Sequence, residues 1–281
     1  MKNLLALCCV LASLLVFSAS ASAVDKESVY DRVIRTNTLR CGYNIWEPSM
    51  IQDPTTKKLS GAYIDYVNEM GKALGVKIEW IFADWGTFPE DIKTGKIDAM
   101  CAGVWADARR GRFLGWTTPP FYNRVDAFAR ADDTRFTPGH NESMNRKDAT
   151  IAVFDGTTPQ KLADMNFPDA HQLSLSSMAS GAEGFMSVTQ KKADIFFSDV
   201  GKFQEFTQKN PTARLRQIST TQAIGLYPQT IAMDIHEHDL KAMLDTATVE
   251  LLNNGVIAKI VKKYDQQGAI FILPAAPVRG Q

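Results

Sequence analysis

The most informative segment of the chain is Gly95–Tyr122, GKIDAMCAGVWADARRGRFLGWTTPPFY. Its apolar residues predict a buried strand over Ile97–Val104, followed by a turn and a short helix that carries Arg109 and Arg110. In open α/β sheets, ligands bind outside the carboxyl ends of the strands. An arginine at that place is suited to hold a carboxylate with two parallel hydrogen bonds. The segment therefore predicts a protein that captures a small anion.

Upstream of this segment, strand and helix patterns alternate. Apolar residues recur at helical spacing over Gly61–Leu74, and Gly75 ends that helix. Short apolar runs on either side predict strands, so the order is βαβαβ, which indicates a parallel sheet with right-handed crossovers. The predicted elements are strand Leu39–Tyr43, helix Gly61–Leu74, strand Val76–Phe82, helix Phe88–Lys93 and strand Ile97–Val104.

The second half repeats this alternation after a polar stretch, Asp132–Asp148, which predicts a surface loop. Gly95-Lys96-Ile97-Asp98 opens a strand in the first half, and Lys191-Lys192-Ala193-Asp194 opens one in the second. This weak repeat favours two similar α/β lobes. The remaining predicted elements are strand Thr150–Phe154, a helix from Gly156, strand Gln172–Leu175, helix Ser180–Lys191, strand Ala193–Phe197, an extended stretch Thr230–Met233, helices over 239–253 and 256–264, and an extended tail over 266–281.

The first residues are typical of a secretory signal peptide over residues 1–23. Lys2 precedes the apolar run Leu4–Phe17, and Ala21-Ser22-Ala23 supplies the small residues that a signal peptidase needs. We expect cleavage after Ala23 and export of the mature chain. A membrane anchor is the rival interpretation, but the run is shorter than the ~20 apolar residues of a spanning helix and has no basic flank after it.

Composition narrows the class of protein. The chain has 281 residues, in which 31 Lys and Arg residues balance 31 Asp and Glu residues. A near-neutral chain without basic runs argues against nucleic acid as a partner. The length suffices for one large domain or for two modest ones, each with its own core.

Two cysteines, Cys41 and Cys101, remain after the signal segment, each inside an apolar run typical of a strand. In an oxidising compartment two such residues can form a disulfide. Two buried free thiols fit the sequence as well, because spacing alone does not show that the side chains meet.

Six segments, in the same order, resemble the polar amino-acid receptors of ABC importers, which are bacterial periplasmic solute-binding proteins of family 3. The likeness covers nearly all of the mature chain. Ala102–Pro119 follows the family pattern A-G-M-T-I-T-P-E-R-A-K-x-V-D-F-S-x-P without a gap. The other five segments are Leu59–Asp65 (family pattern G-F-D-V-D), Trp85–Asp98 (W-x-x-L-I-P-x-L-x-x-G-K-x-D), Ile151–Thr158 (V-A-V-x-x-G-T-T), Ala193–Val200 (x-D-A-x-x-x-D) and Leu240–Lys262 (the closing helices).

The resemblance implies an α/β fold of two lobes, the type II periplasmic binding protein fold, in which helices flank a mostly parallel sheet in each lobe. Lobe one is expected to comprise residues 24–125 and 228–281, and lobe two residues 126–227. Two crossing strands, near Val125–Arg130 and near Ala223–Tyr227, are expected to form the hinge.

The resemblance also implies a binding site for a zwitterion. Closing a cleft around a free amino acid strips water from both of its charges, which is unfavourable unless each charge is paired. By gapless alignment, Arg110 of lobe one takes the carboxylate and Asp199 of lobe two takes the ammonium, so the ligand itself closes the hinge. The plain alternatives are a solvated Arg110 beside Arg109 and Arg112, and an Asp199 that only caps a helix.

Aromatic residues are further pocket candidates. Trp46 follows the first strand, where the family has an aromatic residue that covers the ligand side chain; Trp85 and Phe88 are either a pocket wall or ordinary core. One position departs from the family pattern. Five residues before Arg110 the family has Thr or Ser, which donates to the carboxylate, and this chain has Trp105. A ligand other than a standard polar amino acid is therefore possible, and a cluster of Trp46, Trp85 and Trp105 favours apolar or cationic side groups.

Backbone groups complete the predicted site. Gly103 lets the main chain approach the ligand closely. Thr157 and Thr158 begin a helix, so their hydroxyl and N–H groups either face an anion or simply cap that helix.

We therefore expect a periplasmic, non-enzymatic component of an ABC importer that closes around one small carboxylate, foremost an amino acid or a derivative. It is expected to act as a monomer, to dock on an inner-membrane ABC permease, and to need no cofactor, metal or nucleic acid.

Two other classes stay open. Periplasmic cyclohexadienyl or arogenate-type dehydratases have the same fold and bind a carboxylate, but they need a general acid, for which Glu47 and Glu183 are the candidates. Sensor domains of signalling receptors also have this fold. His236-Glu237-His238 resembles a metal site only superficially, because its spacing suits an exposed face.

Overall fold

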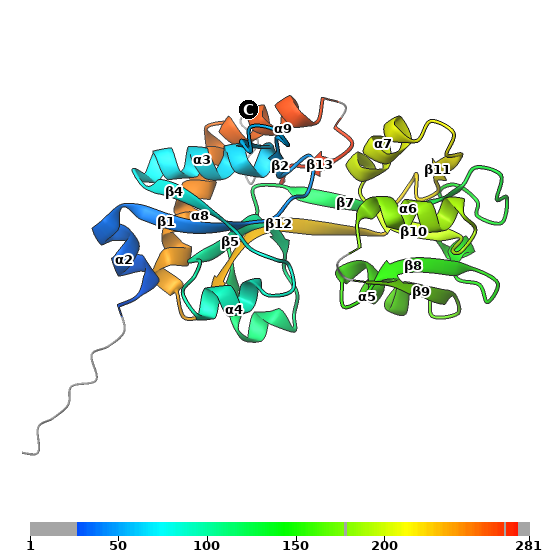
Figure 1. Ribbon diagram of the computed structural model, residues 1–281, viewed down its shortest axis with the longest axis horizontal. Coiled ribbons are helices and arrows are strands. Elements are labelled where there is room, and N and C mark those ends of the chain that lie inside the picture. The colour runs from blue at the N-terminus through cyan, green and yellow to red at the C-terminus, as the bar shows by residue number, and fades with distance from the viewer. Residues whose placement is uncertain (1–26, 177–178, 267, 275–281) are drawn as a thin grey trace, which may run out of the picture.

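A computed structural model describes residues 27–176, 179–266 and 268–274 of the chain. The predicted signal peptide and the end of the predicted tail lie outside these residues. Two lobes are joined by the long strands β7 (Tyr122–Arg130) and β12 (Gly225–Asp234), which run side by side between them (Figure 1). The predicted two-lobed α/β fold is confirmed. Among the described residues, none of the helices is long and apolar enough to cross a membrane.

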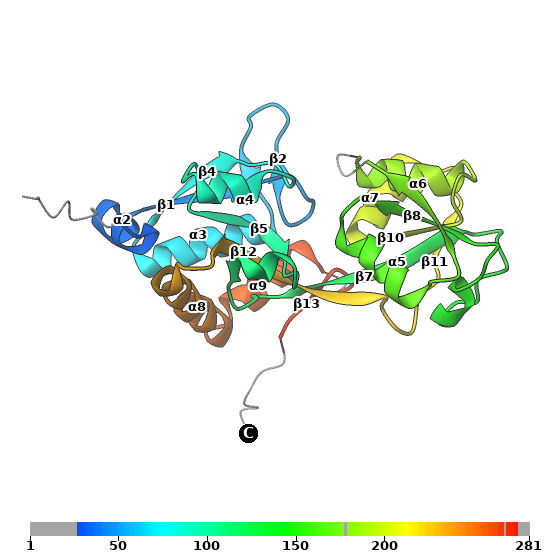
Figure 2. The same ribbon diagram turned by 90° about the horizontal axis from the view of Figure 1, so that it is seen from below.

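Lobe one is built on parallel strands, as the βαβαβ pattern predicts. Strand β1 (Thr38–Tyr43) lies between β4 (Lys77–Phe82) and β5 (Ala99–Trp105), and β12 continues the sheet antiparallel to β5. Helix α4 lies on the opposite side of these strands from α3, α8 and α9 (Figure 2). The helices of this lobe are α2 (Val29–Thr36), α3 (Ala62–Leu74), α4 (Phe88–Lys93), α8 (His238–Asn253) and α9 (Val256–Tyr264).

Lobe two repeats the design with a smaller sheet. Strand β8 (Thr150–Phe154) lies between β9 (His171–Leu175) and β10 (Ile195–Ser198), all parallel, and β7 joins them antiparallel to β10. Its helices are α5 (Thr158–Asn166), α6 (Gly181–Thr189) and α7 (Val200–Lys209).

The hinge strands are longer than predicted. Each serves both lobes: β12 pairs with β5 in lobe one, β7 pairs with β10 in lobe two, and the two pair with each other from Gly225↔Val125 to Pro228↔Tyr122. Both strands are buried along most of their length, so apolar residues continue beyond the segments singled out in the sequence. The exact lobe boundaries stay a prediction.

Short elements that the sequence pattern did not reveal complete the fold. They are strands β2 (Ile51–Gln52), β3 (Leu59–Ser60), β6 (Leu114–Trp116), β11 (Leu215–Gln217) and β13 (Phe271–Ile272), and the 3₁₀ helix Asn141–Met144. A second 3₁₀ helix, Arg110–Arg112, lies where the short helix with Arg109 and Arg110 was predicted. Runs of two to four residues carry too little periodicity to be recognised.

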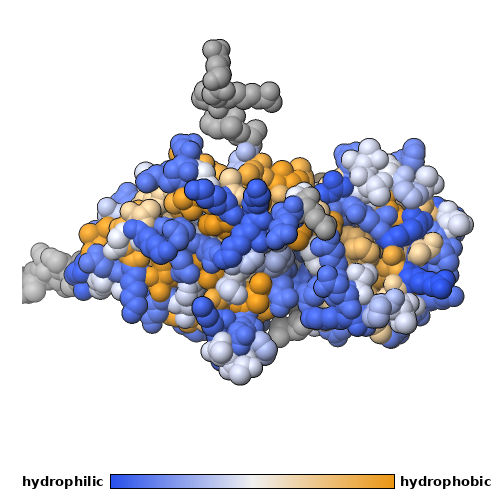
Figure 3. All heavy atoms as spheres, turned by 90° about the horizontal axis from the view of Figure 1, so that it is seen from above, coloured by the Kyte–Doolittle hydropathy of each residue, from blue (hydrophilic) through white to orange (hydrophobic). Residues whose placement is uncertain are grey.

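Buried hydrophobic residues form separate clusters in the two lobes. One large cluster draws on residues 33–121 and 231–271, whereas two smaller ones draw on residues 125–224. On the face drawn in Figure 3, apolar atoms gather over the larger lobe, and the far end of the smaller lobe is mostly hydrophilic. Each lobe therefore has its own core, and β7 and β12 connect the two.

The weak sequence repeat around Asp98 and Asp194 has a counterpart in the structure. Each aspartate stands one residue before its strand, β5 or β10. Asp98 accepts a hydrogen bond from the backbone N–H of Arg40 at 2.6 Å, and Asp194 accepts one from Thr150 at 3.0 Å, so each ties its strand to the neighbouring one. Each carboxylate is also paired with two arginines, Arg32 and Arg40 for Asp98, and Arg130 and Arg135 for Asp194.

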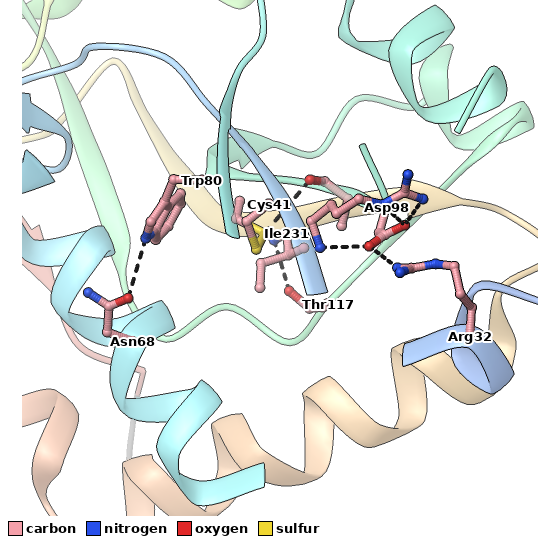
Figure 4. The surroundings of a disulfide bond; sticks show 10 residues. Arg32, Cys41, Asn68, Trp80, Asp98, Thr117 and Ile231 are labelled. Atoms are coloured by element: carbon pink, nitrogen blue, oxygen red, sulfur yellow. Dashed lines mark hydrogen bonds and ion pairs between the residues drawn. A yellow bond between two sulfur atoms is a disulfide. The ribbon is translucent and has the colours of Figure 1, made fainter. Parts of the chain in front are cut away.

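Cys41 and Cys101 form a disulfide between the parallel strands β1 and β5, with a Cα–Cα distance of 5.3 Å. Both residues are fully buried. Figure 4 shows the bond between the Trp80–Asn68 hydrogen bond on one side and the Arg32–Asp98 ion pair on the other. Of the two possibilities that the sequence left open, the structure has the disulfide.

Candidate functional site

The first contact between the lobes joins the loop after β1 to the start of α7. A bridge between Trp46 and Met50, with N–O distances of 2.9 and 2.8 Å, fixes the loop of lobe one. Across from it, the Lys202 ammonium lies 5.5 Å from the centroid of the Trp46 ring. A Cβ atom on Gly201 would lie 3.2 Å from both Pro48 and the Asp199 carboxylate. The structure therefore brings the predicted ligand residues Trp46 and Asp199 to one place.

Asp199 caps α7, as the plain alternative proposed, but only with one of its oxygens. Oδ1 accepts a hydrogen bond from the Lys202 backbone N–H at 2.8 Å. Oδ2 is buried and has no partner among the described residues, and the whole residue is 1% exposed. Burial raises the pKa of the carboxyl to about 6, against the opposing effect of Lys202. A buried, unpaired carboxylate oxygen is unfavourable by itself and is satisfied by a cationic donor.

The second contact between the lobes joins the loop after β5 to the start of α5. Asp107 of lobe one forms an ion pair with Lys161 of lobe two. Burial would raise the pKa of Asp107, but hydrogen bonds from Lys161 and from the Arg109 backbone outweigh it and lower the pKa. Asp107 also accepts from the Arg109 N–H at 2.9 Å, so the ion pair fixes the loop that leads to Arg110.

Arg110 begins the 3₁₀ helix after β5, where a short arginine-bearing helix was predicted. Its guanidinium carbon lies 5.5 Å from the centroid of the Phe88 ring, and the residue is half-buried. Among the described residues, no carboxylate forms a direct ion pair with Arg110, in contrast to Arg124, Arg130 and Arg135. The charge of Arg110 nevertheless helps to lower the pKa of Asp107. Phe88 is fully buried and belongs to the lobe-one core, which Trp85 also contacts.

Trp105 does not join a tryptophan cluster. Its ring stacks on Tyr227 of the hinge, with centroids 4.7 Å apart, and packs against the core of lobe two. The contacts of the described residues include none between the rings of Trp46, Trp85 and Trp105. The three rings therefore do not contact one another in this structure, and whether they line one ligand pocket stays a prediction.

Gln229 ties Trp105 to Gly103. In the amide orientation that satisfies both partners, Gln229 accepts from the Trp105 indole N–H at 2.6 Å and donates to the Gly103 carbonyl at 3.1 Å. Gly103 has a φ of +68°, and a Cβ atom there would lie 2.0 Å from the Gln229 side chain. The glycine thus lets the hinge strand approach β5 closely, and nothing in this geometry tests its predicted approach to a ligand.

The two threonines at the start of α5 do not cap it with their side chains. The Thr157 hydroxyl donates to the Phe154 carbonyl at 2.6 Å, and Thr158 is the first helical residue. Because no side chain caps this helix, its first N–H groups keep the capacity to bind an anion.

Two of the acidic residues considered for other chemistry, Glu183 and Glu237, have structural partners. Glu183 completes a capping box with Ser180, whose backbone N–H and hydroxyl lower the pKa of the carboxyl, so it is ionised at neutral pH. Glu237 accepts a hydrogen bond from the Val29 N–H at 2.9 Å, at the start of α2. Over the described residues, no three His, Cys, Asp or Glu side chains gather as a metal site would require.

The sequence did not single out Lys161 and Lys202. Each stands three or four residues after a predicted ligand residue, and each reaches across to the other lobe. A surface lysine on a helix gives no signal of such a contact, because the contact depends on how the lobes face each other.

Residues 39–267 match the family model of the bacterial extracellular solute-binding proteins, family 3. The chain belongs to this family. A comparison with curated protein sequences gives no match.

Several solved structures share this fold. The ancestral amino-acid-binding protein AncCDT-1, a precursor of cyclohexadienyl dehydratase, is 21% identical with a TM-score of 0.70, over 85% of this chain and 99% of that one. Tv2483, solved with L-arginine, is 20% identical with a TM-score of 0.71, over 89% and 98%. A binding component of an ABC transporter from Wolinella succinogenes, solved with lysine, is 18% identical with a TM-score of 0.70, over 81% and 95%.

Proposed function

We propose that this family-3 protein is the periplasmic receptor of an ABC importer and that it captures one amino acid, or a derivative, by closing its two lobes. Arg110 binds the ligand carboxylate from lobe one. Asp199 binds the ligand ammonium from lobe two. The ligand then bridges the lobes, and the hinge strands β7 and β12 bend to allow closure.

The observation that carries the proposal is the unpartnered oxygen of Asp199. A carboxylate that is 1% exposed, with one oxygen lacking a hydrogen-bond partner, calls for a donor that the described residues do not supply. Arg110, on the other lobe, is half-buried and forms no direct ion pair with a carboxylate of the described residues, although its charge helps to lower the pKa of Asp107. A zwitterion offers a donor to Asp199 and an acceptor to Arg110, and a simple anion or cation offers only one of the two.

Similar proteins support the ligand class. Relatives by fold include proteins solved with arginine, with glutamine and with lysine. The precursor of a dehydratase among them marks an enzymatic alternative. One of the two candidate general acids of that alternative, Glu183, is unsuited to the role here. It caps a helix, and its lowered pKa keeps it ionised at neutral pH.

Trp105 limits how the carboxylate is held. The Thr or Ser hydroxyl that the family has at this position is missing, and the Trp105 indole N–H is already hydrogen-bonded to Gln229. Arg110 and backbone N–H groups must then hold the carboxylate without a side-chain hydroxyl. We expect a monomer that delivers this ligand to an inner-membrane permease.

Isothermal titration calorimetry on two neighbouring arginines tests the proposal. Arg110→Ala is expected to weaken amino-acid binding by at least 100-fold, because a charged hydrogen-bond partner is lost from a desolvated site. Arg109→Ala is the matched control, since Arg109 is exposed and one residue away, and it is expected to change the Kd by less than threefold. Equal affinities for Arg110→Ala and the parent protein would show that the carboxylate is bound elsewhere.

A further inference from the structure

Lys202 stands where the side chain of a bound amino acid is expected. Its ammonium lies 5.5 Å from the centroid of the Trp46 ring, the ring predicted to cover the ligand side chain. Its backbone N–H binds Asp199, the predicted ammonium partner. One residue of α7 therefore borders both halves of the predicted pocket.

The Lys202 ammonium is short of acceptors. Its side chain is only 16% exposed, so little water reaches it. Among the described residues, Nζ donates a hydrogen bond to Glu205 alone, at 3.0 Å. An ammonium has three donors, and the face of an aromatic ring replaces a true acceptor only weakly. The site thus has capacity for one more anionic oxygen.

Neighbouring charges do not supply that oxygen. Glu205 is shared with Lys209, at 2.8 Å, and Glu47 on the opposing loop acts on Lys209. Asp199 accepts a hydrogen bond from the α7 backbone with one oxygen, and the charge of Lys202 helps to lower the pKa of this carboxyl. Its other oxygen has no hydrogen-bond partner among the described residues, and we assign that oxygen to the ligand ammonium.

We infer that Lys202 sets the ligand class: the captured amino acid carries a second acidic group, which lies on Trp46 and pairs with Lys202. This inference rests on the proposed function. A basic side chain would meet a like charge on the face of Trp46, at a distance where like charges in a mostly desolvated site repel strongly. The chain therefore differs from its relatives that were solved with arginine or lysine.

Calorimetry with four ligands and three variants tests this. The probes are L-glutamate, L-aspartate, L-glutamine and L-arginine. The parent protein is expected to bind glutamate or aspartate at least tenfold more tightly than glutamine, and to bind arginine most weakly. Lys202→Met is expected to weaken binding of the acidic ligand by about 10- to 100-fold, the loss of one close charge pair, and to change glutamine binding by less than threefold. Lys202→Arg, which keeps the charge, is expected to retain the preference for the acidic ligand.

Lys209→Met is the matched control. Lys209 bonds to the same Glu205 but is 69% exposed, so its loss is expected to leave all four affinities within threefold. Arginine bound as tightly as glutamate by the parent protein, or equal losses for glutamate and glutamine in Lys202→Met, would overturn the inference and leave the proposed function standing. No binding of any amino acid by the folded parent protein would overturn both.

Discussion

Trp105 and Tyr227 stack almost in parallel, with ring planes 14° apart, although one ends a strand of lobe one and the other lies on the hinge. The contact places a bulky aromatic residue of the predicted site region against β12, the strand that would bend in the closure proposed above. Trp105 is therefore a hinge residue as well as a neighbour of the predicted carboxylate site.

A double-mutant cycle measures this relationship. Trp105→Ala and Tyr227→Ala are each expected to destabilise the protein, and the double variant to cost less than their sum by about 1 kcal/mol, the usual value of a stacked aromatic pair. Urea unfolding of the four proteins gives the free energies. Strict additivity would mean that the two rings do not support each other.

The ionised form of Asp199, which the ligand needs, is expected to lower the free energy of unfolding of the unliganded protein. Its folded pKa of about 6 lies above the usual carboxyl value, so the carboxylate destabilises the folded state at pH 8, and this penalty fades as the pH falls toward 4.5. Asp199→Asn keeps an oxygen for the α7 cap. It is expected to raise the free energy of unfolding at pH 8 by about 1–3 kcal/mol, and by less at pH 4.5. Asp199→Asn should also weaken ligands that have an ammonium more than analogues without one.

Ligand affinity is expected to fall in mild acid. The ligand ammonium needs the ionised form of Asp199, whose pKa in the free protein is about 6, so binding below that pH must release a proton. Between pH 7.5 and pH 5 the Kd is expected to rise about tenfold, as one proton competes with the ligand. Calorimetry in buffers of different ionisation enthalpy gives the number of protons released on binding. A Kd that is flat over this range in the parent protein would separate Asp199 from the ammonium site.

The disulfide is expected to contribute a large part of the free energy of unfolding. Cys41 and Cys101 are separated by 60 residues, and a loop of that length corresponds to about 4 kcal/mol in the chain-entropy model. The variant Cys41→Ala with Cys101→Ala should therefore unfold at much lower urea concentration than the oxidised parent protein. Dithiothreitol should lower the midpoint of the parent protein and leave that of the variant unchanged. Equal sensitivity of both proteins to reductant would contradict this role.

Sequence patterns predicted the elements in which apolar positions recur regularly over many residues. The periodic apolar positions Tyr63, Ile64, Val67 and Met70 are all buried in α3, which begins and ends within a residue of its predicted limits. The turn into the arginines after β5 was also predicted, because a continuous apolar run ends there.

Contacts between the lobes were not predictable in the same way. Trp105 was expected in a tryptophan cluster and instead stacks on the hinge, and Lys202 reaches Trp46 from a helix that the sequence pattern did not delimit. Such contacts join residues far apart in the chain and depend on the packing of two lobes, which local periodicity does not record. The sequence predicted the individual residues of the candidate site. The ion pairs and the pKa shifts around those residues were not predicted and follow from the structure.

The most direct measurement is a thermal-shift screen of the mature protein after unfolding and refolding to remove bound ligand. The library holds amino acids, their derivatives and other small carboxylates, since a ligand that binds the native state alone raises the melting temperature by mass action. We predict a rise with an amino acid, which mass spectrometry then recovers unchanged. A response confined to acids without an ammonium, or conversion of the ligand to a product, would contradict the amino-acid receptor proposed here.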